Sequence, residues 1–599
     1  KPQLLPQDRR EQTHPGGSQL VYDLSLEDSE RIRTFCAANQ LTPAAVFASA
    51  VLLQLARWNQ TDRVVLGMPV SGRTQAATQA MPGLFMHTLP LSFQFVPQMR
   101  ISELLTRVQN QLAAIQDHQA VGLEDLIRML NLPRQAGGNA VFDMMFSLRP
   151  IAADQLHLAG QTLGYQPVPT GLSKLPLTAE VYWEAECWHF CFEFENQRYR
   201  EETIRFYQRS LEHIVMTLMK EDPVWTELDV LAPLDRCRCL DAPNALRVPY
   251  CGLPLDVQIR QRALLHPDQP ALRFHQKTTT FAELIEQADL LAGALMQNAS
   301  DKPAGILCER GEPLFIAMLA LMHCGRAYVP LDPDFPPARI ATMLNQAGAD
   351  LIVGSPALLE KLNLPLPTCS VLAQGPLAKT PDRPLDAVHY CLFTSGSTGM
   401  PKGTQITYRN TAAFLESMRP LIGGCRRALC ATNPVFDVFL TESLVALALD
   451  MTVVIADESQ LRLPWELAAL IENERCDFVQ FTPTRMQMNM ADAAFRKALT
   501  SVKTIIHVGE ALPAPLVRRT AACTQARILN CYGPTETTVY ATWDEVSHSP
   551  VTLGVPLANY ETYILDKAHR RCLPMQAGEL VIGGIGVGLG YINAPDKNA

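Results

Sequence analysis

Residues 393–403, FTSGSTGMPKG, carry the residue types that bind a polyphosphate. Glycines let the backbone approach a ligand closely, hydroxyl groups donate hydrogen bonds, and Lys402 brings a mobile positive charge. A Walker A loop is excluded, because Pro401 precedes the lysine and Gly403 follows it. A plain surface loop of the same composition remains an alternative. The phosphate-binding residues expected here are Thr394, Ser395, Gly396, Ser397, Thr398, Gly399 and Lys402.

The order of further segments resembles the adenylate-forming superfamily. After the glycine-rich loop come HVGEALP from residue 507, NCYGPTE from residue 530 and GELVIGGIGVGLGY from residue 578. CGRAYVPLDPDFPPARI, from residue 324, is similar to a characteristic adenylation-domain motif. The glycine-rich loop and the three segments after it, in the family's order, are together more specific than any single one. The branch that they resemble is the adenylation domain of nonribosomal peptide synthetases.

The resemblance implies a nucleotide site around residues 530–536. Tyr532 would stack on adenine, Asn530 would bond the edge of the base, and Thr535 would contact the phosphates. Glu536 would hold Mg²⁺, for which carboxylate oxygen is a suitable ligand. A β-turn alone would explain Gly533 and its proline neighbour but not the other residues. The remaining nucleotide-binding residues implied are Gly509, Glu510, Ala511 and Gly533.

The same resemblance assigns the substrate to the class of amino acids through Asp437, within NPVFDVFLTE. The matching aspartate pairs with the substrate α-ammonium group, although an aspartate before an apolar helix could also be a helix N-cap. The implied pocket wall carries no charge, so an uncharged substrate side chain is favoured. The wall consists of Val438, Thr441, Gln480, Ile506, Val508, Cys531, Val539 and Tyr540.

The implied reaction is attack of an amino-acid carboxylate on the α-phosphorus of ATP, which yields aminoacyl-AMP and pyrophosphate. Positioning and charge neutralisation do most of this work, and Lys402, Thr535 and Glu536 with Mg²⁺ are the candidate catalytic groups. The product would be loaded onto the phosphopantetheine thiol of a carrier domain outside this chain. Two alternatives stay open: an acyl-CoA or aryl-acid ligase of the same superfamily, and a non-catalytic docking platform for carrier domains.

The elements that position these residues alternate between strand and helix. Residues 305–309 and 327–333 read as strands around a helix over 313–323, which predicts a parallel sheet. Residues 389–393 read as a strand that leads into the phosphate loop. Ligands of open parallel sheets bind at the carboxyl ends of strands, so this placement agrees with the composition of the loop. The expected fold class is α/β throughout.

The first third of the chain resembles a condensation domain. VVLGMPVSGR, GLFMHTLPLSF, HQAVGLEDLIRML and NAVFDMMFSL follow in that family's order, preceded by an expected helix over 41–58 with Thr42 as its N-cap. These pieces match the second of two chloramphenicol-acetyltransferase-like lobes. None of the 13 histidines adjoins another, so the family's HHxxxDG motif is absent from this chain.

We therefore expect a condensation lobe over residues 1–235, a proline-containing linker over 236–253, and the large adenylation subdomain over 254–599. The small C-terminal adenylation subdomain and the carrier domain are expected to be missing, which predicts a weakly active fragment. Carrier domains of the same synthetase are the expected partners. The sequence leaves open whether a small MbtH-like protein is required.

Composition excludes several other classes. A net charge of −9 gives no reason to expect nucleic acid or a membrane surface as partner. The longest apolar run, residues 43–56, is shorter than the roughly 20 residues of a membrane span, and the polar start predicts a cytoplasmic protein. Sixteen scattered cysteines are typical of reduced thiols. Cys187, His189 and Cys191 lie in an alternating stretch, which favours a strand over a metal site.

Overall fold

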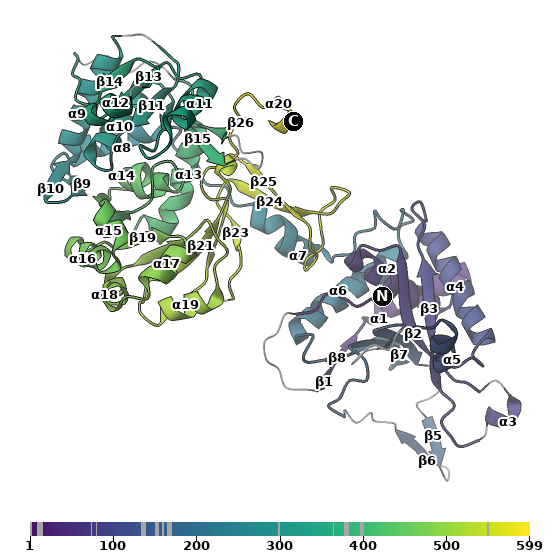
Figure 1. Cartoon of the computed structure of the whole chain (residues 1–599). Coiled ribbons are helices and arrows are strands. Elements are labelled where there is room, and N and C mark those ends of the chain that lie inside the picture. The colour runs from purple at the N-terminus through teal and green to yellow at the C-terminus, as the bar shows by residue number, and fades with distance from the viewer. Residues whose placement is uncertain are drawn as a thin grey trace. The chain divides into compact units, whose positions relative to one another are not determined.

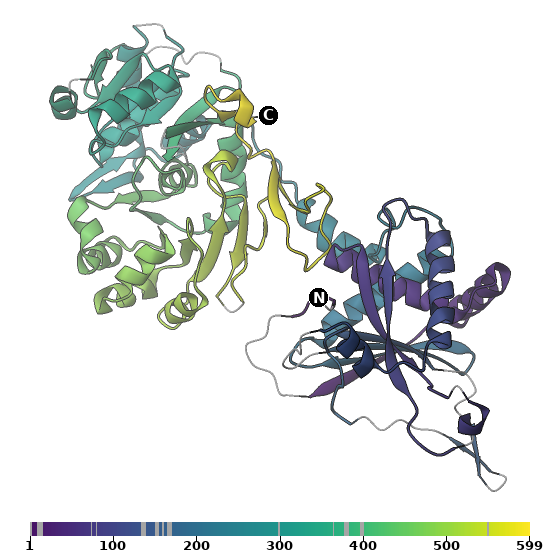
Figure 2. The ribbon, with the colours of Figure 1, turned by 45° about the vertical axis from the view of Figure 1, so that its right-hand side comes forward.

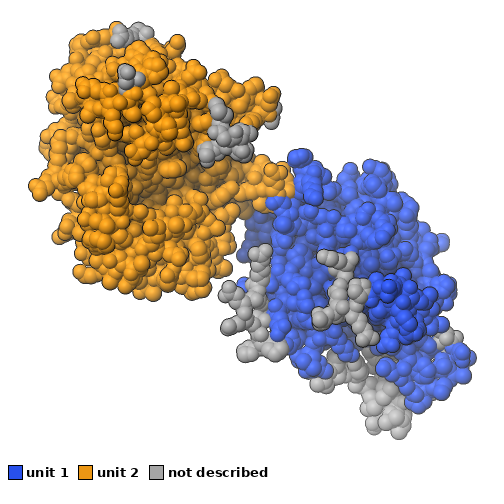
Figure 3. All heavy atoms as spheres, in the orientation of Figure 1, with its two compact units in different colours: residues 1–241, 566–578 blue, residues 242–565, 579–599 orange. Residues whose placement is uncertain are grey.

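The computed structural model describes residues 3–8, 16–73, 75–79, 81–132, 139–149, 155–158, 161–164, 170–297, 300–362, 364–376, 383–395, 401–547 and 550–598. The chain divides into two compact units (Figures 1 and 3). Unit 1 comprises residues 1–241 and 566–578, and unit 2 comprises residues 242–565 and 579–599.

Unit 1 is built on a mixed six-stranded sheet. Its strand order is β1-β8-β7-β4-β2-β3, and β1 pairs with β8 so that Asp23 lies opposite His189. The strands are β1 (Gly17–Asp23), β2 (Arg63–Val70), β3 (His87–Gln94), β4 (Met144–Arg149), β7 (Leu177–Glu184) and β8 (Cys187–Glu195), with a separate hairpin of β5 (Gln155–Leu158) and β6 (Gln161–Gly164).

The central helix of unit 1 is α2 (Pro43–Asn59). Thr42 caps it by accepting a hydrogen bond from the Ala45 N–H, and Pro43 occupies its first turn, as the sequence predicts. Nearly all of α2 is buried in the core that covers the sheet. The other helices are α1 (Leu26–Asn39), α3 (Ala76–Gln79), α4 (Ile101–Asp117), α5 (Leu123–Met129), α6 (Glu201–Leu218) and α7 (Pro233–Arg236).

Residues 566–578 group with unit 1 although they lie far along the chain. Leu573 is part of the unit 1 core, and the Trp58 indole N–H donates to the Pro574 carbonyl over 3.2 Å. The Gln576 side-chain amide donates to the carbonyls of Arg57 (2.6 Å) and Trp58 (3.0 Å). These bonds add partners to carbonyl groups in the last turn of α2, where a helix lacks its full set of internal hydrogen bonds.

Unit 2 contains two large sheets. The first has nine strands in the order β10-β9-β18-β17-β19-β20-β21-β22-β23, with a parallel centre from β9 to β21. These strands are β9 (Pro270–Phe274), β10 (Lys277–Thr280), β17 (Arg427–Cys430), β18 (Thr452–Ile455), β19 (Phe478–Phe481), β20 (Thr504–His507), β21 (Arg527–Tyr532), β22 (Thr542–Glu545) and β23 (Val555–Pro556).

The second sheet of unit 2 has seven strands in the order β14-β13-β11-β12-β15-β16-β26, parallel from β14 to β15. Its strands are β11 (Ala304–Leu307), β12 (Tyr328–Pro330), β13 (Leu351–Gly354), β14 (Thr368–Ser370), β15 (Val388–Ser395), β16 (Pro401–Thr407) and β26 (Gly590–Tyr591). A separate antiparallel pair, drawn in yellow in Figures 1 and 2, is formed by β24 (Tyr560–Leu565) and β25 (Glu579–Gly584).

Local sequence explains several helices of unit 2. A capping box of Thr280 and Glu283 begins α9, and another of Thr407 and Asn410 begins α13. The helices are α8 (Leu255–Leu265), α9 (Phe281–Leu295), α10 (Glu312–His323), α11 (Pro337–Ala347), α12 (Pro356–Leu362), α13 (Tyr408–Ile422), α14 (Ala446–Ala448), α15 (Glu458–Arg462), α16 (Pro464–Glu474), α17 (Pro483–Asn489), α18 (Ala493–Ala498), α19 (Ala514–Ala521) and α20 (Pro595–Asn598).

This architecture is the mixed α/β class predicted from the sequence, with the predicted strand before the phosphate loop present as β15. The division into units departs from the expected domains at two places. The expected linker, residues 236–253, is divided between the units after residue 241. Residues 566–578, expected within the second domain, group with the first because their buried groups pack on α2. Within the described ranges, no single helix is long and apolar enough to cross a membrane; α1 and α2 pass that test only together, across a 106° bend.

Candidate active site

Lys402 lies at the start of β16, directly after the glycine-rich loop. β15 and β16 are antiparallel, with Thr394 opposite Lys402, so the two strands hold both ends of the loop. The expected ligands Gly396, Ser397, Thr398 and Gly399 lie outside the described residues, and Ser395 is described only as the end of β15. On its other edge β16 pairs with β26, which places the Lys402 ammonium 5.6 Å from the centre of the Tyr591 ring.

Tyr591 connects the lysine to the expected metal ligand. Its hydroxyl donates to Glu536 Oε1, and this bond raises the pKa of Tyr591 to about 12. The Glu536 carbonyl accepts from the Gly588 N–H over 2.9 Å. Strand β26 and the turn before it therefore fix both the backbone and the carboxylate of Glu536.

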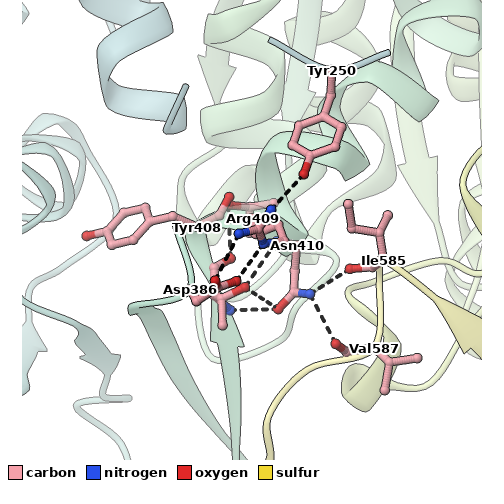
Figure 4. A network of polar contacts seen from close by, with 9 residues as sticks. Tyr250, Asp386, Tyr408, Arg409, Asn410, Ile585 and Val587 are labelled. Atoms are coloured by element: carbon pink, nitrogen blue, oxygen red, sulfur yellow. Dashed lines mark hydrogen bonds and ion pairs between the residues drawn. The ribbon is translucent and has the colours of Figure 1, made fainter. Parts of the chain in front are cut away.

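Asn410 holds that turn in place (Figure 4). Its side-chain amide donates to the carbonyls of Ile585 (2.7 Å) and Val587 (3.1 Å), while its oxygen accepts from the Thr407 N–H (2.8 Å). A single buried amide thus joins the start of α13 to residues 585–587. The preceding residue of α13, Arg409, makes two bonds to Asp386 and one to the Tyr250 hydroxyl.

Asp437 lies beside the same group of residues. Burial raises the pKa of its carboxyl to about 6, against the effect of hydrogen bonds from the Thr535 hydroxyl and the Val438 N–H. The negative charge of Glu536 raises it further. The following π-helix Thr441–Val445 has Leu440 as its N-cap, so Asp437 does not have the helix-capping role considered as an alternative. Its carboxylate at neutral pH is a partly buried charge that needs a cationic partner.

An apolar pocket of unit 2 borders Asp437. Leu314, Met318, Tyr328, Tyr390 and Phe439 line it with neighbouring apolar residues from β11, β12, β15, α10 and residues 434–440, and Asp437 supplies the carboxylate. The Tyr390 hydroxyl is buried and has no hydrogen-bond partner among the described residues. The Asp437 charge contributes to the raised pKa of Tyr390, so the phenol and the carboxylate are close.

The expected pocket wall is brought together in the same unit. Five of its members belong to one apolar core, against which Val438 packs: Ile506, Val508, Cys531, Val539 and Tyr540. The Tyr540 hydroxyl donates to Gln480 Oε1, and the Gln480 amide donates to the Val438 carbonyl over 3.0 Å. Thr441 is fully buried within the π-helix that follows Asp437.

Glu442 was not anticipated from the sequence, although it lies inside the NPVFDVFLTE segment. Its fully buried carboxylate accepts from the Gln480 amide (3.0 Å) and from the N–H groups of Ala431 (2.8 Å) and Thr432 (2.9 Å). Burial raises the pKa of Glu442 to about 7. The expected wall residues themselves carry no charge, but Glu442, next to Thr441, is a buried carboxylate that bonds Gln480 of that wall.

The expected nucleotide-binding residues lie at the carboxyl ends of β20 and β21. Tyr532 is 40% exposed, which leaves its ring accessible to a base. The Asn530 amide donates to the Thr552 carbonyl over 2.6 Å. Glu510 accepts from the N–H (2.9 Å) and hydroxyl (2.5 Å) of Thr484 at the start of α17, so its carboxylate already has partners. Ala511, next in the chain, is exposed.

Glycine is required at two of these positions. Gly509 has a φ of +83°, which a residue with a Cβ rarely adopts. A Cβ on Gly533 would lie 2.7 Å from the Tyr540 Cα and from the Ala541 nitrogen. The backbone that packs against Gly533 is itself strained. Val539, just before Tyr540, has a φ of +68°, which is an outlier for a β-branched residue. Strain of this kind is typical of functional sites.

Family models match the chain in two places. An "AMP-binding enzyme" model matches residues 259–592 and a "Condensation domain" model matches residues 1–224. The chain therefore belongs to the AMP-binding enzyme family, and it covers the condensation and adenylation region of a nonribosomal peptide synthetase.

Known proteins agree with this assignment. Tyrocidine synthase 2 of Brevibacillus parabrevis is 28% identical over 97% of the chain, which corresponds to 17% of that protein. Tyrocidine synthase 3 of the same organism is 25% identical over 97% of the chain and 9% of that protein. A crystal structure of a four-domain nonribosomal peptide synthetase bound to AMP and glycine matches the fold with a TM-score of 0.82, at 23% identity, over 100% of this chain and 46% of that one. The chain thus spans less than a fifth of the length of tyrocidine synthases 2 and 3.

Proposed function

We propose that the adenylation part of this chain selects an amino acid and activates it with ATP as aminoacyl-AMP. The observation that carries the proposal is the half-buried Asp437 carboxylate, bonded by Thr535 and linked through Glu536 and Tyr591 to Lys402. The substrate ammonium would neutralise Asp437 within hydrogen-bond distance of its carboxylate. Lys402 would neutralise the charge of the phosphates, for which its position beside the glycine-rich loop is suited.

A magnesium ion fits this arrangement. Mg²⁺ in nucleotide sites uses one or two carboxylates, with water and phosphate oxygens as its other ligands. Glu536 supplies such a carboxylate, and the Tyr591 hydroxyl bond fixes its orientation. When bound, the ion would neutralise phosphate charge. Tyr532 would stack on adenine, Asn530 would lie at its edge, and Gly509, Glu510, Ala511 and Gly533 would border the nucleotide.

The substrate side chain would lie against Val438, Thr441 and the buried pair of Gln480 and Tyr540. That pair is already hydrogen-bonded within itself and to Val438, so it offers little to a charged substrate. We infer an uncharged amino acid. The activated acyl group would be loaded onto the phosphopantetheine thiol of a carrier domain, and the condensation lobe would serve peptide-bond formation in a longer synthetase. In this view the boundaries are residues 1–235, 236–253 and 254–599, and activity of this piece alone is weak.

Amino-acid-dependent exchange of pyrophosphate into ATP tests the proposal. A panel of amino acids, matched desamino acids and aryl acids should give exchange with one group of uncharged amino acids only. Asp437→Ala should abolish that exchange and leave ATP binding, measured by calorimetry, unchanged. Exchange with aryl or acyl substrates that is indifferent to Asp437→Ala would favour the ligase alternative. No heat with Mg²⁺-ATP would favour a carrier-docking platform.

A further inference from the structure

A small cavity of unit 2 lies beside Asp437, the residue proposed to bind the substrate ammonium. It has a volume of about 10 Å³, which is room for about one water-sized group. Among the described residues that line it, Asp437 alone carries a charge, and Tyr390 on β15 lines it as well. Because the cavity holds about one group, a group that enters it meets both of these side chains.

The Tyr390 hydroxyl is a buried polar group that needs a partner. Tyr390 is 1% exposed, and its hydroxyl makes no hydrogen bond within the described part of the chain. Burial, and then the charge of Asp437, raises the pKa of Tyr390 well above its usual value, so the phenol keeps its proton. Its oxygen can therefore accept a hydrogen bond from a donor in the cavity. Leaving such a group unsatisfied costs free energy, which a ligand would recover.

The Asp437 carboxylate has the complementary need. Its ionised form is buried, and the bonds from the Thr535 hydroxyl and the Val438 N–H do not neutralise its charge. A carboxylate offers about four acceptor positions, so it can take a further N–H donor. A single group that donates to a carboxylate and to a phenol oxygen, and that carries a positive charge, would satisfy both side chains. A primary ammonium group has three such N–H donors.

The rest of the cavity wall also suits a cation. Tyr328 on β12 lies opposite Tyr390 on β15, with ring centroids 5.7 Å apart. Phe439 is buried, whereas Phe436 is 60% exposed and therefore lies at the mouth of the cavity. Aromatic rings attract cations and offer nothing to an anion. An apolar wall also strengthens the attraction between a cation and Asp437, because little water is present to screen it.

We propose that Tyr390 is a second ligand of the substrate ammonium, which occupies this cavity and donates one hydrogen bond to Asp437 and another to the Tyr390 oxygen. This inference rests on the proposed function, because it concerns the same substrate. An ammonium nitrogen is about the size of a water molecule, so it fits the cavity, whereas a methyl group added to it meets Met318 in the wall. The cavity therefore selects primary α-amino acids over their N-methyl forms.

Tyr390→Phe tests the second ligand, because it removes only the hydroxyl. The probe is the amino acid that gives the strongest pyrophosphate exchange with the unmodified chain. Its KM should rise about 10-fold, as for a lost hydrogen bond to a charged group, while kcat and the KM for ATP stay unchanged. The free energy of unfolding without substrate should not fall, since the lost hydroxyl has no partner. Tyr560→Phe is the matched control, because that buried hydroxyl bonds the Thr538 carbonyl (3.5 Å), and it should leave the amino-acid KM unchanged.

Met318→Ala tests the size of the cavity by a gain of function. The N-methyl form of the same amino acid should gain about 10-fold in kcat/KM relative to the primary amine, because one methyl group then has room. Met418→Ala, at a buried methionine of the same unit that does not line the cavity, should leave this ratio unchanged. Calorimetric titration of both amino acids gives the same comparison as dissociation constants, without depending on turnover.

The outcomes separate this inference from the proposed function. If Tyr390→Phe leaves the amino-acid KM and dissociation constant unchanged, or if the unmodified chain accepts the N-methyl form as well as the primary amine, the second ligand is refuted while activation of amino acids stands. If the unmodified chain neither binds nor exchanges any amino acid, or if exchange survives Asp437→Ala, the proposed function itself is wrong.

Discussion

Replacing Asp437 by asparagine should stabilise the protein while it weakens amino-acid binding. The fold raises the pKa of Asp437 to about 6, which is about two units above the ordinary value of 3.9. Because the pKa of Asp437 is higher in the folded than in the unfolded protein, protonation of Asp437 stabilises the fold. This stabilisation is complete below about pH 4 and is lost as the pH rises through 6. Asparagine imitates the protonated form, so at pH 7 it should add about 1–3 kcal/mol of stability.

The same change removes the counter-charge of the substrate ammonium. Loss of one partner from a buried charge pair costs at least about 2 kcal/mol, or about 30-fold in affinity. We expect kcat/KM for the amino acid to fall by at least that factor in pyrophosphate exchange.

Denaturant unfolding at pH 7 and pH 4.5 measures the first effect, and the gain should fall to about a third at the lower pH, which is still above the unfolded pKa of about 3.9. Asp334→Asn, at an exposed aspartate of the same unit, is the control and should leave both properties unchanged. If Asp437→Asn lowers stability at pH 7 and leaves kcat/KM unchanged, Asp437 is not the carboxylate that binds the substrate ammonium.

The remaining predictions concern the groups around this carboxylate. The amino-acid KM should be constant above about pH 7 and should rise about 10-fold per pH unit well below pH 6, as Asp437 takes up a proton; a flat profile would contradict this. Tyr591→Phe should weaken Mg²⁺-ATP binding about 5-fold in calorimetry through loss of one hydrogen bond to Glu536, with unchanged unfolding. Asn410→Ala should lower the free energy of unfolding by about 1–3 kcal/mol, because the Ile585 and Val587 carbonyls lose their donor. Gly533→Ala should cost about 1–3 kcal/mol, since its Cβ would meet backbone atoms at 2.7 Å, whereas the open Gly424 tolerates alanine.

Local chemistry made much of the fold predictable. Thr42 and Pro43 mark the start of α2 because a side-chain acceptor and a fixed φ suit a first helical turn. The apolar residues before the phosphate loop form β15, as their composition predicts. The segments at β16, β20 and β21 were recognised by their resemblance to the adenylation family, because each carries its motif within a few consecutive residues, and the ligand roles of those residues stay predictions.

Contacts between distant segments could not be predicted in this way. Tyr591 has no neighbouring residue that indicates a role, and it reaches Glu536 only because β26 pairs with β16. Glu442 was visible in its segment, but its burial under Gln480 depends on the packing of β19. Residues 566–578 are expected in the second domain from their position along the chain, whereas in the structure they pack against Trp58 and group with unit 1.

The site depends on contacts from residues 585–591, which lie far along the chain from Lys402. Lys402 lies on β16 of the seven-stranded sheet and Glu536 in the 3-10 helix Thr535–Thr537 between β21 and β22, and among the described residues Tyr591 contacts both. The strand that carries Tyr591 adds only two residues to its sheet, too few to be stable by themselves. Its position is therefore supported by further hydrogen bonds: Leu589 to Gln405, the Asn598 side chain to Tyr591, Gly588 to Glu536, and Asn410 to the turn before the strand. Because one amide of α13 stabilises this turn, loss of Asn410 should disturb the orientation of Glu536 without any contact to a ligand. An effect of Asn410→Ala on Mg²⁺-ATP affinity as well as on stability follows directly from that connection.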